Sequence, residues 1–258
     1  MRVSRLGDIC LPGIPFAVLL LAGAWCLYSR RPRNRIPGDH VGIDDRKIAE
    51  GFSRAARMPQ MKLMRWFVAR RATVMVAHGE AIDLGCGPGY LVAEMVRQAP
   101  GLHVTGVDLS DEMLAEARAH AQRRGMAQAV SFRKGDVQQI PFEDGSVDLV
   151  VSTLSLHHWS DPVAVLDEVA RILRPGGSLL IFDLRRDLSA PMWLLLWWVT
   201  GFVVPPSLRR ANEPLASRNA AYTPREAREL AGRAPLDGLC VMRGPLWLTI
   251  EGRKQDAA

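Results

Sequence analysis

The sequence predicts an α/β fold in which helices cover both faces of one sheet of mostly parallel strands. Short apolar runs alternate with amphipathic helical stretches between residues 81 and 183, and this alternation requires the crossover connections of a doubly wound sheet. A turn with three glycines follows the first run, and several runs are followed by aspartate. Ligands in open α/β sheets bind outside the carboxyl ends of the strands, so these residues mark the expected site.

The predicted elements of this body follow the chain in order. Apolar runs predict strands near 81–84, 103–108, 129–134, 147–152 and 178–183, with helices near 90–98, 111–124 and 162–173. Thr223 and Pro224 begin a further helix that ends near residue 233. The last two strands, near 239–243 and 246–251, are joined by a Gly-Pro turn.

The composition is that of one α/β domain with an additional segment. The chain has 258 residues, 48% of them hydrophobic, and a formal net charge of +6. Much of the excess lies in an N-terminal cluster that would suit nucleic acid or an anionic membrane surface: Arg30, Arg31, Arg33 and Arg35. The cysteines lack metal-site spacing, and we expect free thiols in a reducing compartment: Cys10, Cys26, Cys86 and Cys240.

Residues 9–29 contain no charged residue, and about 20 apolar residues suffice to cross a membrane as a helix. The arginine cluster follows directly, so the positive-inside rule predicts a single-pass anchor over residues 1–29, with the body in the cytoplasm. Residues 30–45 are then a basic linker, and residues 46–258 form the domain. Two alternatives stay open, a cleavable signal peptide and a helix packed in the core.

Residues 188–208 form a second uncharged stretch. Spanning a membrane here would remove the last two strands from the sheet, and prolines at 191, 205 and 206 interrupt the run. We expect an insertion that lies in a membrane interface or caps the pocket, with Trp193, Trp197 and Trp198 at headgroup depth. The alternative is an ordinary apolar lid buried over the site.

The glycine turn is the centre of the predicted site. Its glycines, at 85, 87 and 89, permit positive φ and close approach of a ligand, and the free N–H groups of the following helix point back at the turn. Asp83 precedes the glycines, and Asp108 follows them by about 20 residues, at the tip of the second strand. The pattern G-x-G-x-G differs from the dinucleotide fingerprint because position 90 is Tyr. Together these features indicate a nucleoside-type ligand.

Four blocks resemble the class I S-adenosylmethionine-dependent methyltransferases, in that family's order and spacing. They are IDLGCGPG at 82–89, VTGVDLSDEMLAEAR at 104–118, GDVQQIPFEDGSVDLVVSTLSLHHW at 135–159 and LRPGGSLLIFD at 173–183. The pattern is closest to the small-molecule and lipid-quinone methylases. The resemblance implies a Rossmann-like, seven-stranded sheet and S-adenosylmethionine as cofactor. It also implies that the helical residues 46–76 cover the site; packing on the sheet edge is the alternative.

The resemblance assigns the cofactor contacts residue by residue. The amino-acid part is expected beside Asp83 and the backbone of Gly85, Cys86, Gly87 and Gly89. Asp108 is expected to accept both ribose hydroxyls, with Leu109 against the adenine. Asp136 and Val137 are expected at the adenine, although Asp136 would also suit a turn. Ser152 ends the fourth strand and completes the crevice.

Methyl transfer requires a base only when the acceptor is a hydroxyl or a protonated amine. His157 and His158 follow the fourth strand beside the crevice and are the candidates, with a structural role in the turn as the alternative. No third ligand has the spacing for a metal site.

The acceptor is expected to be a hydrophobic small molecule or a lipid-like compound delivered from the membrane. Base-amine methylases of this class carry an N-P-P-aromatic motif where this chain has residues 152–155, STLS, so nucleic acid is disfavoured as a partner. Two other functions stay open: a non-catalytic cofactor-binding or scaffold protein, and a nucleotide-cofactor oxidoreductase.

Overall fold

A computed structural model describes residues 23, 25, 28, 34–37, 45–210 and 212–255. The chain divides into two compact units, Met1–Arg31 and Pro32–Ala258, and the second unit contains the fold described below. Most of the predicted anchor and linker, residues 1–29 and 30–45, lies outside the described residues. In the part of the chain that the structure describes, no helix combines the length and the apolar character needed to cross a membrane.

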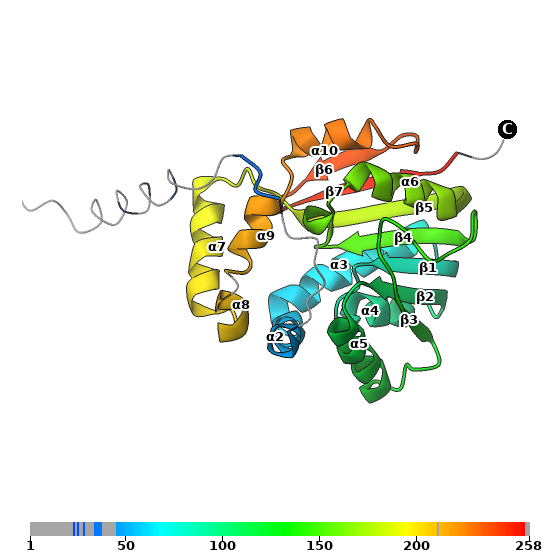
Figure 1. The fold of residues 1–258 in the computed structure, drawn as a ribbon, viewed down its shortest axis with the longest axis horizontal. Coiled ribbons are helices and arrows are strands. Elements are labelled where there is room, and N and C mark those ends of the chain that lie inside the picture. The colour runs from blue at the N-terminus through cyan, green and yellow to red at the C-terminus, as the bar shows by residue number, and fades with distance from the viewer. Residues whose placement is uncertain are drawn as a thin grey trace, which may run out of the picture. The chain divides into compact units, whose positions relative to one another are not determined.

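One seven-stranded sheet organises the second unit, in the order β3-β2-β1-β4-β5-β7-β6 (Figure 1). The strands are β1 His78–Leu84, β2 Gly101–Asp108, β3 Val130–Lys134, β4 Val147–Thr153, β5 Leu173–Leu184, β6 Cys240–Arg243 and β7 Trp247–Arg253. Strands β1 to β5 are parallel, and β7 is antiparallel to both β5 and β6. The predicted doubly wound sheet and its C-terminal hairpin are therefore confirmed.

Alternation along the strands divides the core into two layers. Ile82 and Leu84 belong to a buried cluster with α6 (Pro162–Ile172) and α10 (Pro224–Ala231). Ala81, which directly precedes Ile82, belongs to the opposite cluster, with side chains of α3, α4 and α5. These helices are Pro59–Met75, Tyr90–Gln98 and Asp111–Arg123. Successive side chains of a strand point to opposite faces, which is why both faces carry helices.

Local signals fix most of the helix starts. The Ser110 hydroxyl accepts from the backbone N–H of Met113 at 3.1 Å, which caps α5 as its sequence suggests. Thr223 and Glu226 form a reciprocal capping box at α10. Strand β5 begins five residues earlier than its apolar run, because Leu173 pairs with β4 before residues 174–177 interrupt the register.

Residues 46–76 form two helices with different positions. Helix α2, Arg46–Ala56, contacts α5 and α8 (Pro206–Arg210), with the Ser53 hydroxyl donating to Glu116 at 2.7 Å. Helix α3 instead packs on α4 and the sheet through Val68, Ala69 and Ala72. Figure 1 places α2, α7, α8 and α9 beyond the ends to which β4 and β5 point. Helix α3 therefore packs on a face of the sheet, whereas the alternative expectation placed these helices at the sheet edge. That α2 covers the site stays a prediction.

The uncharged stretch 188–208 contains α7, Ala190–Phe202, and the start of α8; α9, Leu215–Ala220, follows. Helix α7 has two apolar faces. Trp193, Leu196 and Thr200 are buried, whereas Trp198 is 51% and Phe202 71% exposed. The expectation that Trp193 lies at headgroup depth is wrong, because that ring packs inward. The helix is thus buried on one face and exposes apolar side chains on the other.

Candidate functional site

The glycine turn has the conformation that its sequence predicts. Gly85, Gly87 and Gly89 all have positive φ, which an L side chain adopts only under strain. A Cβ at Gly85 would lie 2.2 Å from the Ser155 hydroxyl oxygen, so that face of the turn is closed by protein. A Cβ at Gly87 would meet nothing within 4 Å. The turn is therefore packed at Gly85 and open to a ligand at Gly87.

Asp108 lies at the end of β2 and is fixed by this turn. Its Oδ2 accepts from the Gly87 N–H at 2.8 Å, and its Oδ1 accepts from the Ser110 N–H at 2.9 Å. A carboxylate has about four lone-pair sites, so both oxygens can accept one more hydrogen bond. Burial raises the pKa of Asp108, and the backbone N–H groups oppose that rise. This is an oriented pair of acceptors suited to a diol.

Asp83 is the buried acid of the site. It is 1% exposed, and its Oδ1 has no hydrogen-bond partner among the described residues. Burial, and then repulsion from Asp108, raise the pKa of Asp83 well above its usual range. An unpartnered buried carboxyl is costly in free energy, and a cationic ligand group would remove that cost.

The remaining predicted cofactor residues occupy different environments. Leu109 is exposed and Val137 is buried. Asp136 is half-buried, and its Oδ1 accepts from the Gln138 N–H at 2.9 Å, as in an Asx turn. Ser152 is fully buried, and its hydroxyl donates to the Leu84 carbonyl at 2.9 Å. Ser152 therefore has a structural role in joining β4 to β1, which the sequence did not predict.

His157 has a partner that sequence reasoning missed. Its Nδ1 lies 2.8 Å from Oδ1 of Asp183, and its backbone N–H donates to Oδ2 at 2.9 Å. Both side chains are buried, and Nε2 of His157 has no partner among the described residues. Burial lowers the pKa of His157, but the charge and hydrogen bond of Asp183 outweigh it and raise the pKa. The available signal was the position of Asp183 in β5, near the same end of the sheet as Asp83 and Asp108.

His158 and Arg35 lie beside His157, which together with Asp183 forms the pair that we call the dyad. The His158 ring is half-buried, with its centroid 4.1 Å from that of His157. Arg35 donates to the Ala220 carbonyl at 2.7 Å and to the His157 carbonyl at 3.3 Å, and its guanidinium lies 4.3 Å above the Tyr222 ring. The sequence places Arg35 in a basic linker, whereas the structure makes it part of the fold beside the dyad.

Comparison with known families decides what this site belongs to. Residues 82–181 match a family described as a methyltransferase domain. That range contains the glycine turn, Asp108, Asp136 and His157. Over this range the chain has a class I S-adenosylmethionine-dependent methyltransferase domain.

Curated relatives match the same part of the chain. A malonyl-[acyl-carrier protein] O-methyltransferase from Erwinia billingiae is 34% identical over 150 residues, which cover 56% of each chain. A demethylmenaquinone methyltransferase from Thermus thermophilus is 36% identical over 124 residues, 46% of this chain and 54% of the relative. The chain thus spans about half the length of these curated relatives.

A solved structure supports the fold over a longer range. A putative S-adenosyl-L-methionine-dependent methyltransferase from Methanococcus maripaludis superposes with a TM-score of 0.66, covering 83% of this chain and 95% of that one. Its sequence identity of 21% limits the likeness to the fold.

The residues present fit S-adenosylmethionine, the cofactor that this domain implies. The open side at Gly87 leaves room beside the turn, and the unpartnered Asp83 oxygen suits the cationic amino-acid part. Asp108 presents two acceptors for the ribose diol, and exposed Leu109 can cover an adenine face. When bound, the cofactor supplies a methyl group already activated by its sulfonium.

Proposed function

We propose that this chain methylates a hydrophobic small-molecule or lipid-like acceptor at a membrane, with S-adenosylmethionine as donor. The buried Asp83 next to Asp108, at the glycine turn, supports the donor. The observation that carries the acceptor class is the two-sided helix α7, whose buried face contains Trp193 and whose exposed face contains Trp198 and Phe202. An apolar helix at the carboxyl end of the sheet can both cover an apolar acceptor and contact lipid.

The membrane part of the proposal also draws on the sequence. Residues 9–29 are uncharged and precede an arginine cluster, so we propose a single-pass anchor with the methyltransferase domain on the cytoplasmic side. The relative from Thermus thermophilus is named for demethylmenaquinone, a quinone-type compound. That name agrees with the acceptor class, which for this chain is a proposal.

We further propose His157 as the proton acceptor when the acceptor atom is a hydroxyl. Asp183 holds Nδ1 and stabilises the imidazolium, which leaves Nε2 to take the proton. His157 is only 1% exposed, so the acceptor reaches it after the cover formed by α9 and Arg35 opens. The family match argues against an oxidoreductase.

Transfer of labelled methyl from S-adenosylmethionine into the organic phase of a membrane extract tests the function. The full chain should label an organic-soluble product. His157→Gln should lower kcat by about 10²–10⁴-fold, with the cofactor Kd unchanged as a sign of correct folding. His158→Gln is the matched control and should stay within about threefold. Equal labelling of soluble polar acceptors without membranes would contradict the acceptor class.

A further inference from the structure

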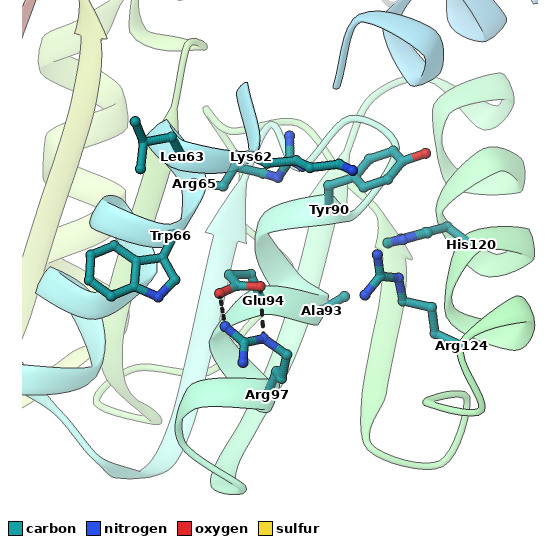
Figure 2. Close-up of a pocket in the computed structure, with 10 residues that line it drawn as sticks. All are labelled: Lys62, Leu63, Arg65, Trp66, Tyr90, Ala93, Glu94, Arg97, His120 and Arg124. Atoms are coloured by element: carbon teal, nitrogen blue, oxygen red, sulfur yellow. Dashed lines mark hydrogen bonds and ion pairs between the residues drawn. The ribbon is translucent and has the colours of Figure 1, made fainter. Parts of the chain in front are cut away.

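A cavity of about 390 Å³ lies between α3, α4 and the end of α5 (Figure 2). It contains none of the residues assigned above to the cofactor or to the dyad. Its polar lining comes mainly from basic side chains, Lys62, Arg65, Arg97 and Arg124. Leu63 and Trp66 form an apolar part of the wall. A cavity with this lining is suited to a ligand that is anionic at one end.

The positive charge of the cavity is only partly compensated. Glu94 is the one acidic residue of the lining, and it is bound by Arg97, with an Nε–Oε2 distance of 3.0 Å. Arg65 is buried, and its guanidinium lies 5.0 Å from the centroid of the Tyr90 ring. Lys62 and Arg124 are exposed and form no ion pair within the described part of the chain. Lys62 and Arg124 therefore line the cavity without a carboxylate partner among the described residues, and Arg65, whose Nη1 donates to the Ala56 carbonyl, adds a third positive charge.

His120 is an independent sign that the cavity suits a polar ligand. Its ring is 5% exposed, and neither ring nitrogen has a hydrogen-bond partner among the described residues. Figure 2 shows the ring beside Arg124 and facing Tyr90, whose ring centroid is 3.9 Å away. Buried polar groups are nearly always hydrogen-bonded in folded proteins. An anion in the cavity would accept from the imidazole N–H.

The charges around His120 favour an anion as that partner. Burial is the main cause that lowers the pKa of His120 to about 4, and repulsion by nearby arginines adds to it. These arginines come from two parts of the chain: Arg57 and Arg65 lie before and on α3, and Arg123 and Arg124 lie at the end of α5. A bound anion offsets this repulsion and stabilises the protonated ring.

We propose that this cavity binds the phosphate group of an anionic ligand. Guanidinium groups match phosphate oxygens in geometry and charge, and the neutral His120 adds a donor. Leu63 and Trp66, 58% and 42% exposed, offer contact to an apolar portion of the same ligand. Tyr90, in the cavity wall, directly follows Gly89, so the site adjoins the cofactor turn. The phosphate belongs either to a lipid headgroup or to a soluble compound.

The pKa of His120, measured by NMR on the full chain in zwitterionic detergent or in vesicles, tests the site. The resonance is assigned by its loss in His120→Gln. In one arm inorganic phosphate is titrated; in the other, vesicles containing phosphatidic acid are compared with pure phosphatidylcholine vesicles. Either addition should raise the pKa of His120 by one unit or more. A response to phosphate indicates a soluble ligand, and a response only to phosphatidic acid indicates a lipid headgroup.

Variants test whether binding depends on the residues that line this cavity or only on the positive charge of the surface around it. Lys62→Gln with Arg124→Gln should weaken phosphate or phosphatidic acid binding at least tenfold. Arg123→Gln removes one charge beside the cavity without lining it, and should stay within twofold. Retained binding of S-adenosylmethionine confirms that each variant is folded. The proposal is overturned if neither addition moves the pKa of His120, if the double variant binds as the parent does, or if S-adenosylmethionine displaces phosphate competitively.

Discussion

Asp83 and His120 are both buried titratable residues, but the charges around them have opposite signs. Each is at least 95% buried and has a polar side-chain atom without a partner among the described residues. Burial raises the pKa of Asp83 and lowers the pKa of His120, so it favours the neutral form of each. Nearby groups of like charge add to both shifts, Asp108 for Asp83 and the arginines for His120. A cationic ligand group would stabilise the charged form of Asp83, and an anionic group would stabilise the charged form of His120. A buried charge conflict thus indicates the sign of the ligand that relieves it.

The largest expected effect concerns the acidic site. Asp108→Ala removes the two oxygens that we propose as acceptors for the ribose hydroxyls, and hydrogen bonds to a charged group contribute about 1.5–3 kcal/mol each. The affinity for S-adenosylmethionine should fall about 100-fold or more, as measured by calorimetry. Gly87 N–H loses its acceptor as well, so a thermal melt should accompany the titration. Unchanged affinity would remove Asp108 from the cofactor site.

Asp83→Asn should separate cofactor binding from stability. A folded-state pKa above the unfolded value means that the acid stabilises the fold only at low pH, and that this contribution is lost as pH rises through the raised pKa. Without ligand the variant should therefore be more stable at pH 7, by about 1 kcal/mol or more. Its cofactor affinity should fall about tenfold. Denaturant unfolding and calorimetry check both, and a less stable free variant would show that Asp83 is not a strained acid.

His120→Gln should change stability in acid. The pKa of His120 is lowered to about 4, so the unfolded chain binds more protons between pH 4 and 6.5, and stability falls as pH drops through that range. Between pH 7 and pH 5 the free energy of unfolding of the variant should fall by about 1 kcal/mol less than that of the parent. Urea unfolding at both pH values measures this difference. Parallel losses in both proteins would mean that the ring is not held neutral.

Tyr90→Leu is expected to have the smallest effect and reports on communication between the sites. The ring covers His120 and contacts Arg65, whereas its backbone continues from the glycine turn. Its loss should hydrate His120 and raise the pKa of that imidazole, while cofactor affinity changes by less than about threefold. NMR titration and calorimetry check the two readouts. A large loss of cofactor affinity would mean that the two sites are coupled through Tyr90.

Several features could be predicted from the sequence because their causes are local. Strand and helix positions follow from periodicity, the glycine turn from three glycines in five positions, and the start of α10 from Thr223 and Pro224. Asp83 and Asp108 were found because each lies at the end of an apolar strand next to that turn. For α7 the composition indicated an apolar insertion, but which tryptophan faces inward depended on how the helix packs.

The sequence by itself determined the order of elements, the cofactor turn and its two aspartates, since residues within one strand and the next turn are sufficient to specify them. Tertiary structure decided which distant groups meet: His157 with Asp183, Arg35 with Tyr222, and the basic residues of α3 and α5 around His120. Neither charge compensation nor burial can be read from one residue type. Both arise only when separate elements pack together and exclude water from the groups between them.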